Sequence, residues 1–215
     1  MKKIYIPLLC LILFASCRPR LITKGIKDKT SNYIVTTGGK QIDASTVHIN
    51  LENVTADTAT YPIDSVSAIK KGQAYYGVQD RLFYDGVYYG KLMLLRRYAG
   101  MSYDMNNHTS HAVYNYYLQK QGQPEIVDLT SRSLIDYVQD NPLALRKART
   151  SRICANISIV SGITTIVGLS CVVLPWSSPI RKPAVMVGLF SMPTFLISLP
   201  VASHKRYKSI IVYNR

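Results

Sequence analysis

The histidines in the middle of the chain are the first side chains to examine for chemistry. His108 and His111 lie three residues apart, a spacing that can bring two metal ligands together. Asp104 is near, but no third cysteine, aspartate or glutamate stands at a useful spacing, and His48 is distant in the chain. We interpret the segment as a polar loop and expect neither a bound metal nor a cofactor.

Sequence signatures of common catalytic sites do not occur in the chain. There is no Gly-x-Ser-x-Gly, no His-Glu-x-x-His and no phosphate-binding glycine loop. Asp80 and Asp85 are five positions apart near a turn, a spacing too common to indicate a carboxylate pair. The sequence therefore favours a protein that is not an enzyme. The alternative is an envelope enzyme that acts on cell-wall glycan or lipid, with its site on the tyrosine-rich strands.

Cys17 is the residue for which the sequence predicts a covalent modification. Two lysines, an apolar stretch from Ile4 to Phe14 and two small residues form a secretory signal peptide over residues 1–16. The tetrad Phe14-Ala15-Ser16-Cys17 resembles the lipobox of bacterial lipoproteins, which usually has leucine in the place of Phe14. The resemblance implies a lipidated cysteine that becomes the first residue. An ordinary cleaved signal and an uncleaved anchor are the alternatives.

The residues after the cysteine bear on where the protein resides. Residues 17–31 are polar and irregular, which is typical of a tether. Arg18, Pro19 and Arg20 stand where surface-exported lipoproteins of Bacteroidetes tend to have acidic residues. We therefore expect a domain that faces the periplasm, anchored in the outer membrane or, alternatively, in the inner one.

Tyrosine dominates the middle of the chain, where ten of the sixteen tyrosines fall between Tyr75 and Tyr117. Tyrosine offers rigid contact area with a polar tip, so these residues could form a recognition surface for glycan, peptide or a partner protein. They also suit half-exposed strands without any binding role. Neighbouring tyrosines on a strand point to opposite faces, so at most half can serve one surface. The candidates are Tyr75, Tyr84, Tyr88, Tyr98, Tyr114 and Tyr116.

Residues 32–145 have the pattern of a small β-rich domain. Period-two alternation and β-branched or aromatic runs predict strands at 33–37, 40–42, 46–51, 65–69, 74–78, 91–98 and 112–119. Turn signals stand at Gly38-Gly39, Lys71-Gly72, Asp85-Gly86 and Gln121-Gly122. We expect a loop at 53–60, while 79–90 is ambiguous between a helical turn and a strand.

One or two helices follow the strands. Thr130 is a suitable N-cap for a helix with Leu134, Ile135 and Val138 on its apolar face. A second helix is expected after Asn141, which can cap a helix whose first residue is Pro142.

The last third of the chain predicts a two-helix transmembrane hairpin over residues 146–203, followed by a basic tail at 204–215. Two uncharged runs, 153–176 and 183–203, each exceed the roughly 20 residues that cross a bilayer. Gly168 and Gly188 would let the helices approach closely, whereas Pro193 and Pro200 should kink or fray the second one. The fold class is therefore α+β: a small β-rich soluble domain with one or two helices, followed by this hairpin.

Charge is distributed unevenly and gives conflicting signals on topology. No acidic residue follows Asp140, and the basic residues beyond it bracket the apolar runs: Arg146, Lys147, Arg149, Arg152, Arg181, Lys182, Lys205, Arg206, Lys208 and Arg215. More of these basic residues lie before the first apolar run and after the second than in the link between the two runs. By the positive-inside rule, this distribution would place the domain in the cytoplasm. The leader indicates export, and we follow the leader. Membrane lipid is the expected counter-charge, and nucleic acid is not an expected partner.

Several short segments together resemble a group of conserved Bacteroidetes membrane lipoproteins of unknown function. They are Gly90-Lys91-Leu92, Tyr116-Tyr117-Leu118 with Val127-Asp128-Leu129, Asp140-Asn141-Pro142 and the ending Ile210-Ile211-Val212-Tyr213-Asn214. The resemblance implies a location and no activity. We expect a non-enzymatic, lipid-anchored envelope protein that binds or scaffolds an envelope protein or a glycan. A subunit of a membrane complex is a further alternative.

Overall fold

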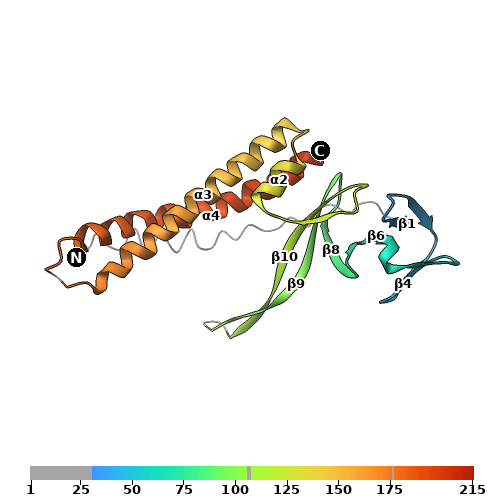
Figure 1. Ribbon diagram of the computed structural model, residues 1–215, viewed down its shortest axis with the longest axis horizontal. Coiled ribbons are helices and arrows are strands. Elements are labelled where there is room, and N and C mark those ends of the chain that lie inside the picture. Colours follow the sequence, from blue (N-terminus) through green and yellow to red (C-terminus); the bar gives the residue numbers. More distant parts are fainter. Residues whose placement is uncertain (1–30, 106–107, 176) are drawn as a thin grey trace. The chain divides into compact units, whose positions relative to one another are not determined.

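The computed structural model describes residues 31–105, 108–175 and 177–215 (Figure 1). These residues form two compact units. The β unit contains residues 31–137 and the last four residues, Val212–Arg215, whereas the helical unit contains Val138–Ile211. The expected α+β class is confirmed. The expected signal peptide and nearly all of the tether lie outside the described residues.

An eight-stranded antiparallel sheet forms most of the β unit, in the order β11-β10-β9-β8-β7-β6-β1-β2. Its strands are β1 Asn32–Thr36, β2 Gln41–Ala44, β6 Val66–Lys71, β7 Ala74–Gln79, β8 Leu82–Tyr88, β9 Leu92–Asp104, β10 Thr109–Lys120 and β11 Ile126–Asp128. From β6 to β11 each strand pairs with its neighbour in sequence, which makes a meander. The turn signals at Gly39, Gly72 and Gly122 are confirmed, because each glycine has a positive φ between two strands.

A second sheet contains β3 Val47–Ile49, β4 Asn53–Ala56 and β5 Ala59–Pro62. The expectation of a loop at 53–60 was therefore wrong. The turn between β4 and β5 uses Asp57 at φ 54° instead of glycine or proline. The Asp57 carboxylate accepts hydrogen bonds from the Ser45 and Thr46 amides, which lower its pKa and hold the turn.

The ambiguous segment 79–90 contains strand β8, not a helical turn. Asp80 and Arg81 both have positive φ, at 52° and 60°, as a two-residue hairpin turn requires. Gly86 is not a turn residue, as the sequence suggested, but lies within β8. A Cβ atom there would stand 3.0 Å from the Cβ of Tyr75, so the glycine makes room for that side chain.

The helix starts are as expected from the sequence. Helix α2 spans Ser131–Tyr137, and the Thr130 hydroxyl accepts a hydrogen bond from the Ser133 amide at 3.1 Å. Helix α3 spans Pro142–Ser170, and the Asn141 side chain accepts a hydrogen bond from the Ala144 amide, also at 3.1 Å. Each cap satisfies an amide that has no partner within its helix.

The chain end is fastened within the β unit by the side chain of Asn214. Its carboxamide accepts a hydrogen bond from the Leu92 amide at 2.8 Å and donates one to the Leu92 carbonyl at 2.7 Å. A Cβ atom at Gly90 would lie 2.5 Å from the Asn214 side chain, so a larger residue there would displace Asn214. Two of the motifs noted in the sequence, Gly90-Lys91-Leu92 and the chain ending, thus meet at the first residue of β9.

Two long helices make up the helical unit, α3 and α4 (Arg181–Tyr213). A short 3-10 helix, η2, extends α3 through Cys171–Val173. With that extension the two helical segments have 32 and 33 residues and are long and apolar enough to cross a membrane. Helix α4 continues through Pro193 and Pro200 without fraying, and it includes the expected basic tail up to Tyr213.

The contact between α3 and α4 is built from glycine and hydroxyl residues. A Cβ atom at Gly168 would lie 2.5 Å from the Ala184 carbonyl oxygen and 2.6 Å from the Gly188 Cα, so the backbones touch here. Ser151 donates to the Ala202 carbonyl at 2.8 Å, and the Thr165 and Ser191 hydroxyls are 2.9 Å apart. Large apolar side chains face outward, among them Phe190 and Ile166 at 74% and 71% exposed.

The glycine contact gives a prediction in which packing opposes helix propensity. Gly168→Ala should reduce the free energy of unfolding of the helical unit by about 1–3 kcal/mol because of overpacking. Propensity alone would raise it by about 1 kcal/mol. Thermal unfolding of the full chain in detergent, followed by circular dichroism, shows whether the substitution lowers or raises the stability of the helical unit. Val167→Ile adds bulk to the neighbouring exposed position and should leave the midpoint unchanged. A stabilised alanine variant would contradict the observed contact.

Candidate functional site

Tyrosines on the two faces of the large sheet differ in burial. The strand register assigns each residue to a face. Residues directly opposite each other in an antiparallel pair share a face, and the faces alternate along each strand. Tyr75 and Tyr84 lie on one face with Leu95 and Ile126, all buried in a single cluster. We call this the core face; a second buried cluster with Ile34, Ile69 and Val78 lies on the opposite face, where β1, β6 and β7 pair. Tyr75 is 3% exposed and Tyr84 is 7% exposed, so neither belongs to a recognition surface.

The Tyr75 hydroxyl takes part in a buried hydrogen-bond network on the core face. It donates to the Gln119 Oε1 at 2.9 Å. The Gln119 Nε2 donates in turn to the carbonyls of Ser67 at 3.4 Å and Gln123 at 3.2 Å. Burial, and secondarily Tyr89, raise the pKa of Tyr75 above its ordinary range. The hydroxyl is therefore a neutral donor and not a base near neutral pH.

A small cavity of about 160 Å³ borders this network and has Tyr33, Tyr75 and Tyr89 in its wall. Lys70 is fully buried, with its Nζ 5.8 Å from the centre of the Tyr33 ring and 5.6 Å from that of Tyr89. Such distances allow a favourable cation–π interaction. The Tyr33 and Tyr89 hydroxyls hydrogen-bond to each other. Because these polar groups bond to one another, we interpret the cavity as part of the core.

The opposite face carries an aromatic cluster around Arg96 in which Tyr98 is exposed and Arg96, Tyr114 and Tyr116 are half-buried. The rings of Tyr98 and Tyr114 meet edge to face with their centres 6.1 Å apart. The Arg96 guanidinium lies 4.6 Å from the Tyr114 ring centre and its Nη2 is 3.2 Å from the Asp85 carboxylate. Tyr116 stands directly opposite Arg96 in the register. Asp85 therefore pairs with an arginine and not with Asp80.

A β-bulge brings two more large side chains to this face. Tyr98 pairs with Tyr114, but Gly100 pairs with Val113, so Ala99 is the extra residue. The inserted residue shifts the alternation by one beyond the bulge. Met101 and Tyr103 consequently share the face of Tyr98, which they would not do in a regular strand. We call the resulting set the tyrosine stripe: Arg96, Tyr98, Met101, Tyr103, Tyr114 and Tyr116.

Most of the stripe lies on an arm formed by β9 and β10 alone. Strand β8 pairs with β9 only as far as Arg96, and β11 pairs with β10 only from Tyr117. The arm, residues 97–104 and 109–116, extends beyond both neighbours (Figure 1). From Tyr98 to Val113 every described side chain is exposed, and Gly100 is half-exposed. The arm thus covers no core of its own.

The other face of the arm is more polar. Its register positions include Ser102, opposite His111, and Asn115, opposite Arg97. His108 and His111, considered above as metal ligands, both have local hydrogen-bond partners. His108 Nδ1 lies 3.0 Å from the Tyr103 hydroxyl, and His111 Nε2 lies 3.1 Å from the Thr109 hydroxyl. Within the described ranges, no group of three His, Cys, Asp or Glu residues could hold a metal ion.

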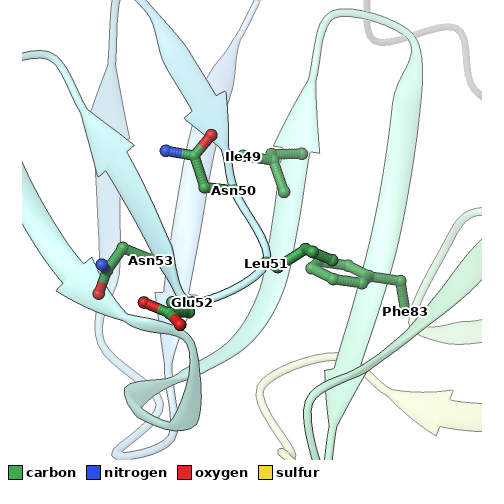
Figure 2. A pocket seen from close by; sticks show the side chains of 6 residues that line it. All are labelled: Ile49, Asn50, Leu51, Glu52, Asn53 and Phe83. Carbon is green, nitrogen blue, oxygen red and sulfur yellow. The ribbon is translucent and has the colours of Figure 1, made fainter.

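An open apolar hollow lies apart from the arm, between the β3–β4 turn and β8. Leu51, 85% exposed, lies beside the Phe83 ring, while the side chains of Glu52 and Asn53 point away from it (Figure 2). Ile49 and Asn50 complete the lining of this hollow of about 630 Å³. It brings no set of polar groups together, so its geometry supports no chemistry.

Comparisons with family models, with curated proteins and with solved structures find no match for the chain. The site therefore has to be argued from its own geometry. Of the six candidate tyrosines, Tyr98, Tyr114 and Tyr116 gather in the stripe, and Tyr88 is half-buried opposite Leu94. Cys17 lies outside the described residues. Arg96, Met101 and Tyr103 were not among the candidates. Their alignment depends on the bulge at Ala99, for which Gly100 was the only signal in the sequence.

The buried network gives a stability prediction. Tyr75→Phe leaves the Gln119 oxygen without its donor and should lower the free energy of unfolding by about 1–3 kcal/mol. Tyr98→Phe, at an exposed position, should change it little. Because burial raises the pKa of Tyr75, folding favours its neutral form, and stability should fall as pH rises above about 10. Tyr75→Phe should therefore show a smaller fall in the free energy of unfolding between neutral and alkaline pH than the unchanged protein. Urea unfolding of both variants, at neutral and alkaline pH, provides the measurement.

Proposed function

We propose that the chain is a non-enzymatic binding module of the bacterial cell envelope, held at a membrane by a lipid on Cys17 and by α3 and α4. The tyrosine stripe is its recognition surface, and the partner is an envelope protein. The β unit faces the periplasm because the leader predicts export, and the outer membrane is the favoured anchor because the positive-inside rule, which conflicts with the leader, does not govern insertion there.

The arrangement of side chains on α3 and α4 supports the membrane part of the proposal. Hydroxyl and glycine residues such as Ser158, Thr165 and Gly168 are buried between the helices, while large apolar residues such as Val160 and Phe190 are exposed. A helix pair in water would bury the large residues and expose the hydroxyls. The reverse pattern suits hydrocarbon, where close packing and internal hydrogen bonds hold helices together.

The exposure of the stripe supports the binding part. A ribbon that covers no core has no structural need for Tyr98, Met101 and Tyr103 on one face, yet these side chains are 57%, 68% and 56% exposed. Tyrosine, methionine and arginine are enriched in the cores of protein interfaces. Contiguous apolar exposure of this kind is typical of interaction sites.

The shape of the stripe favours a protein over a small molecule. Ligand pockets are concave and enclose most of the ligand. The stripe lies on a two-stranded ribbon, and the cavity at Tyr75 belongs to the other face of the sheet. An open surface of rigid aromatic side chains suits a partner that is itself a folded protein.

Site-specific photo-crosslinking in cells tests the recognition surface. A photoreactive amino acid at Tyr103 should give an adduct with a partner protein, and one at Ser102 should not. The two positions are adjacent in sequence but occupy opposite faces of the arm, so they form a matched pair. Tyr98 should behave like Tyr103, and His111 like Ser102. Equal adducts from both faces, or none from either, would refute the stripe as the binding surface.

The anchoring is tested by replacing the predicted lipid site. Cys17→Ser should abolish metabolic palmitate labelling, whereas Cys10→Ser, in the apolar part of the leader, should leave it intact. The unlipidated protein should still remain in the membrane pellet after alkaline carbonate washing, because α3 and α4 hold it. Labelling that survives in Cys17→Ser excludes this attachment site. Release into the wash excludes the transmembrane assignment.

A further inference from the structure

The arm leaves one long backbone edge of β9 open. In the described sheet, β9 pairs with β10 on one side over its whole length and with β8 on the other only up to Arg96. The outward amides and carbonyls of residues 97–104 therefore have no strand beside them. An exposed edge of this length is a template for another strand, and proteins normally shorten, cover or interrupt such edges.

The sequence of this edge is nearly symmetric about its centre. Residues 97–104 read Arg-Tyr-Ala-Gly-Met-Ser-Tyr-Asp. If an identical strand pairs with it antiparallel about Met101, with Ala99 left unpaired as it is against β10, Gly100 stands opposite Ser102, Tyr98 opposite Tyr103, and Arg97 opposite Asp104. Opposite charges and aromatic pairs in such positions stabilise an antiparallel sheet, while like charges destabilise it.

The bulge makes the faces agree in this pairing. Because Ala99 is the extra residue, Tyr98 and Tyr103 occupy the same face of the arm, and the positions of Arg97 and Asp104 share the other. In a regular strand Tyr98 and Tyr103 would lie on opposite faces and could not meet across the edge. The contact would be isologous, with the same residues contributed by both copies, as twofold dimers require.

We infer that a second copy of this chain pairs edge to edge with the 97–104 segment of β9, which joins the two arms into a four-stranded ribbon. The two tyrosine stripes then form one continuous surface with Tyr98 of each copy beside Tyr103 of the other. The inference goes beyond the proposed function, because copies can pair through this edge whether or not a partner protein binds the stripe.

Charge reversal tests the pairing and its register together. The full chain in detergent is studied by light scattering over a concentration series, which gives the dimer dissociation constant. Arg97→Asp alone, or Asp104→Arg alone, places like charges opposite each other twice in the symmetric contact. Each should weaken the dimer about tenfold. The double variant, with both charges reversed, should return to within a few-fold of the unchanged protein.

Two controls keep the test specific. Lys91→Asp reverses an exposed charge beside β9 but outside the arm, and it should leave the dissociation constant unchanged. Circular dichroism should show every variant folded, and Lys91 and Arg97 are both exposed. A protein that stays monomeric at all concentrations overturns the inference, and so does a double variant whose dissociation constant does not return toward that of the unchanged protein.

A dimer that is unaffected by the arm variants but dissociates in Gly168→Ala would place the contact between helices instead. Membrane retention and partner crosslinking are read separately, so failure here leaves those results unaffected.

Discussion

The pairing of β9 with β10 determines where nearly every functional side chain of the β unit points. Twelve residue pairs connect the two strands, and the bulge at Ala99 divides them into two stretches with opposite alternation. Below the bulge, β9 buries Met93 and Leu95 in the core. Beyond it, the same strand aligns Met101 and Tyr103 with Tyr98 on a face that has nothing beneath it. A single inserted residue therefore extends the exposed stripe of Tyr98 and Tyr114 along the arm to Met101 and Tyr103.

Both units bury polar side chains, and in each unit several of them are paired internally. In the β unit the Tyr75 hydroxyl and the Gln119 carboxamide satisfy each other and nearby carbonyls. In the helical unit Ser151 and Ser209 donate to the backbone of the facing helix. An unpaired polar group would cost about 1–3 kcal/mol in either setting, so these bonds specify which surfaces meet. The outward-facing residues of the two units differ, and those of the helical unit suit the hydrocarbon that we propose surrounds it.

The contrast between the two units explains why one protein can have such different surfaces. The β unit has its aliphatic residues inside, with Ile34 and Ile69 fully buried. The helical unit has its smallest residues inside, because Gly168 and Gly188 let the backbones touch. Water drives the first arrangement through the hydrophobic effect. In hydrocarbon that driving force between helices is absent, and close packing takes its place.

The sequence by itself determined the α+β class, most of the strands, both helix caps and the two apolar helices, because these depend on local periodicity and on residues near each boundary. Thr130 and Asn141 cap the helices that their positions predict. The hairpin turn at Asp57 was missed because an aspartate, not a glycine, takes the positive φ. Only the tertiary structure decided which tyrosines are exposed. Tyr75 and Tyr98 look alike in sequence, but the register across β7, β8, β9 and β10 buries one and exposes the other, since a side chain's face depends on its partner strand.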